Sequence, residues 1–498
     1  MLIQPDTYIR LIKNCPLDKT YDHTLYFNNE TEQITYFKNT LQGIPFNKQN
    51  YQRYDKNVLH IQEKAENLYD CNYLMFQNTA FGNKYFYAFI TSIEYVNNVS
   101  SKVYYVIDVM QTWFFDYTLQ HCFVEREHAE TDNIGENLIP ENLNLGEYVS
   151  ENASKFSELV EYSIVIAATH AVEDGKINLK SGRIYSLIYS GLFYNVFPAT
   201  DDGATQANAF ISLDSLLPGG SGIVSIFMMP TSLISNNAFP KAFDKIITKH
   251  YGSWGEFTPN NNKLYTYPYN FLYVSNLQGN SATYKYEFFD SENCVFYLIG
   301  DTSCNPGVIL IPTNYKGVTT NYDESITLSG FPQCAYTNDA FAANLSQLSS
   351  GGNISALSAS VANIAVGNPS GVLPVISSLV DVGRSLITPN QARGGSNNYT
   401  LFASGCLNFY YANKRITREF AEIIDGYFDM YGYATRKVKI PNINSRPHWN
   451  YVKTNKCVIT GSVPADTAIQ ICSIYDRGIT FWKNGSEVGN YSLDNRPA

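Results

Sequence analysis

Charge is missing from one long internal stretch of the sequence. Residues 340–380 contain no Asp, Glu, Lys or Arg, whereas 16% of the whole chain is charged. At that rate about six or seven charges would be expected over the same length. The stretch also lacks Tyr and Trp, in a chain that holds 39 Tyr. We call residues 340–380 the uncharged segment, because its composition sets it apart from a chain that otherwise reads as soluble.

The chain also lacks the sequence signatures of common enzymes. It contains no GxSxG, HExxH, GxxxxGK[ST] or GxGxxG motif, and its seven His are scattered. The densest group of acids and bases is Glu125, Glu127 and His128. In a strand the two Glu would share one face and His128 the other, which favours a solvated or intersubunit charge ladder over a catalytic site. Asp201 and Asp202 are typical of a turn. We predict no enzymatic activity, no cofactor and no metal.

Other absences limit the compartment and the partners. The nine Cys are an odd number without a CxxC pair, which argues against a disulfide framework or a zinc knuckle. We expect the Cys to be reduced and mostly buried, in a protein that is synthesised in a cytoplasm. The N-terminus has no secretory signal, and no run of 18 apolar residues occurs. A net charge of −10 argues against a protein that binds nucleic acid tightly through a basic patch. It does not argue against a protein that lets nucleic acid pass without binding it.

Aromatic residues are abundant, at 14% of the chain, and they favour β structure. Residues 84–96 and 102–115 read as two long strands joined by a short polar turn. Both faces of this hairpin are apolar, so we expect each face to be buried, against a second sheet or against a neighbouring copy of the chain. Short β-like runs between residues 151 and 335 predict outer β-sandwich or barrel domains. Their Tyr residues also suit stacking on sugars, although packing is the favoured use.

The C-terminal region changes pattern. An amphipathic helix is predicted at about 414–431, with Asn413 as its N-cap and Gly432 after its end. A second short helix is predicted from Asp466 toward Arg477. The chain is then expected to end as a hairpin around an Asn484-Gly485 turn.

The uncharged segment has three competing interpretations. Apolar residues recur at helical spacing on both sides of a break at 367–371, namely Ile354, Leu357, Val361 and Ile364, then Val375, Leu379, Val382 and Leu386. A core helical hairpin, a flexible linker and a sheltered membrane-active loop all fit this pattern. The absence of charge lowers the cost of entering lipid, which suits the third interpretation.

Several ordered blocks of the sequence resemble a known family. The chain resembles the tail knob, or distal tail tube, proteins of small short-tailed phages of the Picovirinae type. The resemblance covers about the first 130 residues and the last 90. It is carried by residues 73–95, 105–116, 123–128, 431–442, 449–461, 476–482 and 489–495.

The resemblance implies a fold and a domain layout. It implies a mainly β protein with a β-barrel tube domain built from both chain ends, inserted outer β-sandwich or barrel domains, and a long apolar loop. The corresponding ranges are 1–150 and 399–498 for the tube domain, 151–335 for the outer domains and 336–398 for the loop, which we call the plug loop.

The resemblance also implies a function. Family members form a homo-hexameric ring at the phage tail tip, assembled in the host cytoplasm, and genomic DNA passes through the ring without sequence-specific binding. The implied partners are other tail and collar proteins, the host membrane and, in addition, cell-wall polysaccharide. The plug loop would close the channel and then penetrate the membrane through Leu345, Leu348, Ile354, Leu357, Val361, Ile364, Val366, Val372, Leu373, Val375, Ile376, Leu379, Val380, Leu386 and Ile387. The alternatives are a tail-borne cell-wall hydrolase and a receptor-binding tail module.

Overall fold

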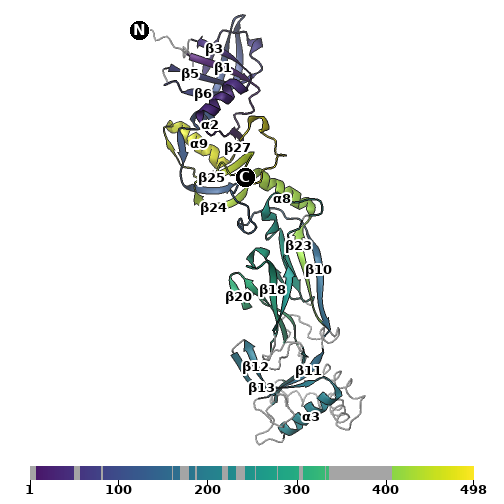
Figure 1. Ribbon diagram of the computed structural model, residues 1–498. Helices are drawn as coiled ribbons and strands as arrows, with labels where there is room; N and C mark the ends of the chain where they lie inside the picture. Colours follow the sequence, from purple (N-terminus) through teal and green to yellow (C-terminus); the bar gives the residue numbers. More distant parts are fainter. Residues whose placement is uncertain are drawn as a thin grey trace, which may run out of the picture. The chain divides into compact units, whose positions relative to one another are not determined.

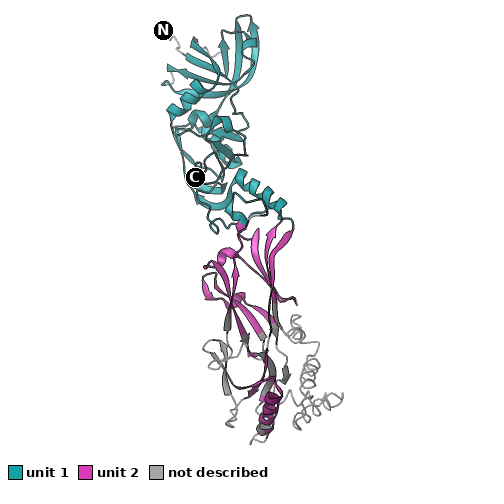
Figure 2. Cartoon of the chain, turned by 45° about the vertical axis from the view of Figure 1, so that its right-hand side comes forward, with its two compact units in different colours: residues 1–146, 253–264, 417–498 teal, residues 147–252, 265–416 magenta. Residues whose placement is uncertain are grey.

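A computed structural model gives the fold of the chain (Figure 1). It describes residues 7–49, 57–79, 82–159, 161–168, 179–185, 188–215, 223–231, 242–252, 254–277, 279–301, 307–330, 333–335 and 406–497. The contacts between residues divide the chain into two compact units (Figure 2). Unit 1 comprises residues 1–146, 253–264 and 417–498, and unit 2 comprises residues 147–252 and 265–416. The predicted mainly β fold is confirmed.

The first sheet of unit 1 is antiparallel, with the strand order β3-β1-β5-β6-β7-β4. Its strands are β1 (Thr7–Lys13), β3 (Gly43–Gln49), β4 (Val58–Ile61), β5 (Cys71–Asn78), β6 (Tyr85–Asn97) and β7 (Ser100–Ile107). Both faces of β5 and β6 are covered by the chain itself: Tyr87 and Phe89 enter one core, and Leu74 and Ala88 enter another. The far end of the β6–β7 hairpin is exposed, with Tyr95 at 53%.

The predicted hairpin is confirmed for its first strand and shortened for its second. The chain leaves β7 at Ile107, and residues expected to continue the strand form helix α2 (Val109–Trp113). Asp108 causes the switch, because its side chain accepts hydrogen bonds from the backbone N–H groups of Met110 and Gln111 and so caps the helix.

The second sheet of unit 1 joins the two ends of the chain, with the order β2-β27-β25-β9-β24. Its strands are β2 (His23–Leu25), β9 (Cys122–Glu127), β24 (Tyr433–Lys439), β25 (Trp449–Asn455) and β27 (Ile479–Trp482). A small ladder pairs β8 (Tyr117–Leu119) with β26 (Ile459–Gly461). The core under this sheet holds Trp449 and Trp482, whose ring centroids lie 5.1 Å apart. Burial of such side chains contributes about 1.5–3 kcal/mol each.

Helices complete unit 1. Besides α2, they include α1 (Glu30–Thr35), the π-helical turn η1 (Tyr36–Thr40), the 3-10 turn η2 (Ala65–Asn67), α8 (Arg418–Tyr431), α9 (Ala465–Arg477) and the 3-10 turn η10 (Gly485–Glu487). Gly432 ends α8 with φ +62° as predicted, but Asn413 is not its N-cap. Asn413 lies in strand β23, whose ladder runs on to Ile416 and delays the helix.

The predicted C-terminal hairpin is wrong. Strand β27 pairs with β25 and β2 instead of folding back on the residues that follow it. The side chain of Asn484 accepts hydrogen bonds from Ser486, which makes it the cap of η10 and not the first residue of a two-residue turn.

The described part of unit 2 contains three sheets, and all three contribute side chains to one core. The first has the order β10-β23-β16-β17, and the second the order β15-β18-β19-β20, with β21 also on β19. The strands are β10 (Tyr148–Leu159), β23 (Cys406–Ile416), β16 (Asn270–Ser275), β17 (Ser281–Tyr284), β15 (Ala242–Thr248), β18 (Asn293–Asp301), β19 (Gly307–Tyr315), β20 (Val318–Thr320) and β21 (Ile326–Gly330). The 3-10 turns are η5 (Asn262–Tyr265), which runs across the border of the two units, η6 (Tyr286–Phe288) and η7 (Tyr322–Glu324). The common core includes Phe409, Leu272, Phe296 and Leu310.

A third sheet of unit 2 has the order β12-β13-β11-β14-β22. Its strands are β11 (Tyr162–Ala168), β12 (Leu179–Tyr185), β13 (Ile188–Pro198), β14 (Ile223–Pro230) and β22 (Gln333–Ala335). Helix α3 (Asp201–Ser215) packs on it through Ala207 and Phe210. Asp201 and Asp202, expected in a turn, therefore form the first turn of this helix, where negative charge favours the helix dipole.

Candidate functional site

The predicted plug side chains, from Leu345 to Ile387, all lie outside the described residues, as does the whole uncharged segment. The structure does describe the strands that flank the plug loop. The chain leaves at β22, where Ala335 pairs with Ile226 of β14, and returns at β23, where Cys406 pairs with Leu159 of β10. Both flanks belong to unit 2.

The returning strand is firmly held. β23 lies between β10 and β16, and its side chains Phe409, Ala412 and Ile416 are fully buried. Tyr286 donates a hydrogen bond from its hydroxyl to Asn413 over 3.0 Å. These contacts between described residues hold the strand that follows the plug loop.

The charged strand Glu125 to His128 differs in part from the predicted solvated or intersubunit charge ladder. Glu127 is 1% exposed, pairs with Lys439 and accepts a hydrogen bond from the backbone of Asn442 over 2.8 Å. Glu125 is only half-buried and pairs with Lys453. The two Glu are in different surroundings because the ladders on both sides of β9 shift register beside them.

His128 is a structural side chain. Its Nδ1 accepts a hydrogen bond from the backbone N–H of Tyr451 over 2.7 Å, so Nε2 carries the proton and donates to the carbonyl of Asp429 over 2.9 Å. Burial, and then the charge of Arg446, lowers the pKa of His128 to about 3. With both ring nitrogens engaged and the imidazole kept neutral, His128 is not placed to transfer protons.

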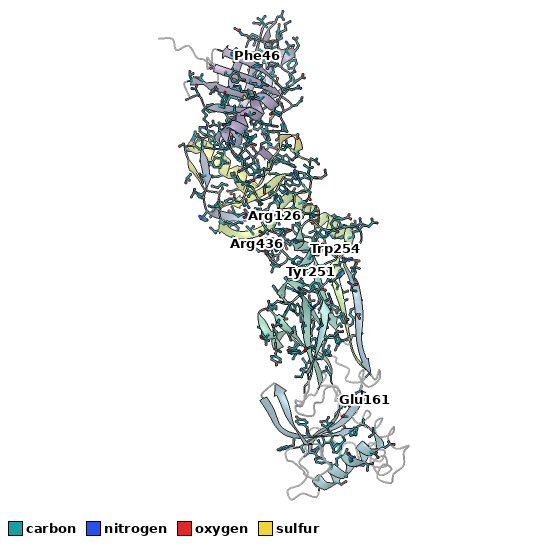
Figure 3. All side chains as sticks on the ribbon, viewed as in Figure 1. Phe46, Arg126, Glu161, Tyr251, Trp254 and Arg436 are labelled. Atoms are coloured by element: carbon teal, nitrogen blue, oxygen red, sulfur yellow. The ribbon has the colours of Figure 1, made fainter. Side chains whose placement is uncertain are left out.

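An ion network lies beside this strand. Figure 3 labels Arg126 of β9 and Arg436 of β24, two strands that pair in the second sheet of unit 1. The Arg126 guanidinium lies over the ring of Tyr427, 4.8 Å from its centroid, and pairs with Glu141. Lys263 pairs with the same carboxylate over 2.7 Å, and both are almost fully buried. Burial lowers the pKa of Lys263, and the negative charge of Glu141 opposes this shift.

A second polar group holds residues 253–264 in unit 1. Asp425 accepts hydrogen bonds from the backbone N–H groups of Asn260 (2.8 Å) and Asn261 (3.0 Å), and Asp132 accepts one from that of Asn262 (2.8 Å). Asp429 adds a bond from the Asn261 side chain over 2.7 Å. This polar group was not predicted from the sequence. The run of three Asn was its only local signal, and such a run reads as a turn.

Among the residues that the structure describes, no group of three or more His, Cys, Asp or Glu is arranged to hold a metal ion. No described helix is long and apolar enough to cross a membrane.

Comparison with known proteins gives two family matches. The model of the Bacillus phage phi29 tail knob protein gp9, C-terminal domain, matches residues 235–380 and 383–496, more than half of the chain. The model of the Caudoviral major tail protein N-terminus matches residues 5–118. The two matches together extend over both units.

Individual relatives agree with the family matches. Tail knob protein gp9 is 24% identical in Bacillus phage PZA, 25% in phi29 and 26% in B103, in each case over 98% of this chain and 98% of the relative. The structure of the bacteriophage C1 tail knob protein, gp12, matches with a TM-score of 0.61 and 16% identity, covering 99% of this chain and 100% of that one. It shows a shared fold.

These findings confirm the resemblance seen in the sequence. The names of the relatives support a structural role and not an enzymatic one. The chain belongs to the family of the tail knob protein gp9 of Bacillus phage phi29.

Proposed function

We propose that this structural protein of the phage tail forms a homo-hexameric ring around a channel for genomic DNA, and that its plug loop closes the channel and then enters the host membrane. The ring would join other tail and collar proteins. Membership of the tail knob family supports a place in the virion tail. The observation that carries the membrane role is the uncharged segment itself.

The composition of the uncharged segment suits both states of such a loop. Residues 340–380 have no charge to bury, so transfer into lipid avoids the largest desolvation cost. Six copies inside a ring would shelter one another's apolar side chains from water. The described flanks lie in ordered strands of unit 2, so the loop is an insertion that leaves and rejoins one unit.

Charge supports the passage of DNA. Each chain carries a formal charge of −10, so a hexamer carries about six times that value. An acidic lumen repels phosphate and a neutral lumen does not attract it, so DNA would not adhere during ejection. The protein would act as a conduit without reading sequence.

The membrane role is tested by dye release from liposomes. The triple variant Leu357→Asp, Ile364→Asp and Leu379→Asp places charge on the apolar positions and is expected to lose most of the release. Its matched control, Leu357→Met, Ile364→Leu and Leu379→Met, keeps the positions apolar and should retain release. Equal release from both variants, or from a chain lacking residues 340–390, would refute the membrane role.

The ring is tested by the mass of the native assembly. Six copies of a 56.1 kDa chain give about 340 kDa. Native mass spectrometry or light scattering of the purified protein should find this value. A stable monomer at micromolar concentration would contradict the channel, because one copy cannot enclose DNA.

Exposed aromatic side chains in unit 2 favour a second role, in binding cell-wall polysaccharide. Tyr148 and Tyr267 are 41% and 40% exposed, and both pack against the ring of Phe271. Exposed rings of this kind stack on sugars. The double variant Tyr148→Ala, Tyr267→Ala should bind purified host cell walls less tightly, whereas Tyr69→Ala, an exposed Tyr of unit 1, should not. Equal binding of cell walls by the wild type, the double variant and Tyr69→Ala would exclude a role of these two Tyr in polysaccharide binding.

A further inference from the structure

Three thiols meet at one end of the second sheet of unit 1. Cys122 begins β9, Cys457 lies between β25 and β26, and Cys472 lies in α9. All three are free thiols. Cys122 is buried, and the other two are half-buried. The proposed channel, membrane and polysaccharide roles do not involve these thiols.

Hydrogen bonds of the surrounding backbone bring Cys457 to the helix. The carboxylate of Asp476 in α9 accepts from the backbone N–H of Cys457 over 3.0 Å and from the hydroxyl of Thr454 over 2.7 Å. Cys472 lies four residues before Asp476, so the two side chains share one face of α9. The Cys457 loop therefore lies beside this face of α9, and the thiols of Cys457 and Cys472 interact electrostatically.

The third thiol is close but differently placed. Gln120 donates its backbone N–H to the carbonyl of Val458 over 2.9 Å, which holds the start of β9 beside the Cys457 loop. The thiol of Cys122 interacts electrostatically with both Cys457 and Cys472. Cys122 is only 5% exposed. Among the three, Cys457 and Cys472 are therefore the pair that oxidants from solvent reach.

We propose that Cys457 and Cys472 form a redox pair that closes to a disulfide once the virion has left the reducing host cytoplasm. The oxidant is a small-molecule disulfide such as glutathione disulfide. The thiolate of Cys472 attacks it and releases one small thiol, and Cys457 then attacks the mixed disulfide and releases the second. One protein S–S bond forms, the oxidant's S–S bond breaks, and the two S–H protons pass to the two released thiols.

The surroundings of the pair set its rate. Burial, and then the neighbouring thiols Cys472 and Cys122, raises the pKa of Cys457, and burial also raises the pKa of Cys472. Only the thiolate reacts, so closure is slow at neutral pH and should accelerate up to about tenfold per pH unit between about pH 7 and 9. A slow reaction suits a bond that forms over the life of a released particle and not during assembly.

The sequence allows the bond to be assigned by peptide mapping. No Lys or Arg occurs between Lys456 and Arg477, so one tryptic peptide carries both Cys, and cleavage before Asp466 separates them. The full-length protein is incubated with glutathione disulfide at pH 8, then denatured and alkylated with N-ethylmaleimide. We expect peptide 457–477 to be unalkylated and about 2 Da lighter, and its two halves to stay joined until reduction. Cys122 should carry the alkyl group.

Variants test whether the disulfide joins Cys457 to Cys472 and whether it raises thermal stability. Cys472→Ser should abolish the mass loss, and Cys122→Ser should leave it intact. Closure ties α9 to the sheet, so oxidised protein should unfold about 2–6 °C higher than reduced protein, a shift absent in Cys472→Ser. Full alkylation of peptide 457–477 after oxidation would overturn the proposal, and so would a bond that joins it to Cys122.

Discussion

Two buried ionisable side chains in unit 1 carry opposite pKa shifts. Burial raises the pKa of Asp108 to about 6, against the hydrogen bonds from Gln111, Tyr73 and Met110, which lower it. Burial lowers the pKa of His128 to about 3. Each shift makes the stability of unit 1 depend on pH, in opposite directions. All four Trp of the chain belong to unit 1, so their fluorescence reports its unfolding.

Replacement of Asp108 by Asn should remove a pH dependence. An acid whose pKa is raised from 3.8 to about 6 stabilises the fold fully only below its unfolded value, and this contribution is lost as pH rises through about 6. Asn cannot ionise but keeps an oxygen that caps α2. Between about pH 4.5 and 7.5 the stability of Asp108→Asn should therefore rise by about 2 kcal/mol relative to wild type. Urea titrations followed by Trp fluorescence measure this, and a difference that does not vary with pH would contradict it.

Replacement of His128 by Asn should remove the opposite dependence. A base whose pKa is lowered to about 3 stabilises the fold above its unfolded value of 6.5, and the contribution is lost as pH falls toward the folded value. Wild type should lose about 2–3 kcal/mol between about pH 7.5 and 4.5 that His128→Asn does not lose. The same titrations test this prediction. If the stabilities of the two proteins varied with pH in parallel, the pKa of His128 would be the same in the folded and unfolded states, and the prediction would be wrong.

At the scale of the elements, the strands were predictable and several connections were not. β6, β7, β11 and β19 show apolar and aromatic runs that favour strands wherever they occur. Helix α2 was missed because its residues Val109–Trp113 also suit a strand, and the cap on Asp108 decides between the two. Helix α3 was missed because small Ala side chains fill part of its buried stripe.

Gly432 marks an element boundary that only Gly tolerates. It ends α8 with φ +62°, and a Cβ there would lie 2.3 Å from the carbonyl oxygen of Glu127 in β9. Gly432→Ala should therefore destabilise unit 1 by about 3 kcal/mol or more. Gly426, inside the same helix, is the matched control because a Cβ there meets nothing within 4 Å. Gly426→Ala should stabilise by about 0.5–1 kcal/mol. If thermal unfolding found Gly432→Ala more stable than Gly426→Ala, position 432 would not require glycine and the prediction would be wrong.

At the scale of the whole molecule, the family was visible in the sequence while the polar contacts of unit 1 were not. The blocks near both ends carry the resemblance, and β2, β9, β25 and β27 bring them into one sheet. Asn261 meets Asp425, and Asn262 meets Asp132, only because the chain returns to unit 1 at residues 253–264. No local pattern encodes such a contact, since its partners lie more than a hundred residues apart. The plug loop was identified by composition and position, and its residues stay a prediction.

Removal of residues 340–390 should separate the assembly of the knob from its membrane activity. The flanks of the plug loop end in β22 and β23 of unit 2, and the deletion leaves about 19 residues to join them, enough for a flexible connection. The Trp-reported stability of unit 1 should stay within about 0.5 kcal/mol of wild type, because unit 1 contributes neither flank. The native mass should remain that of six chains, less the deleted residues, while dye release falls to background. If the deletion instead dissolves the ring, the uncharged segment is part of what holds the subunits together, and the view of it as a sheltered, deployable loop fails.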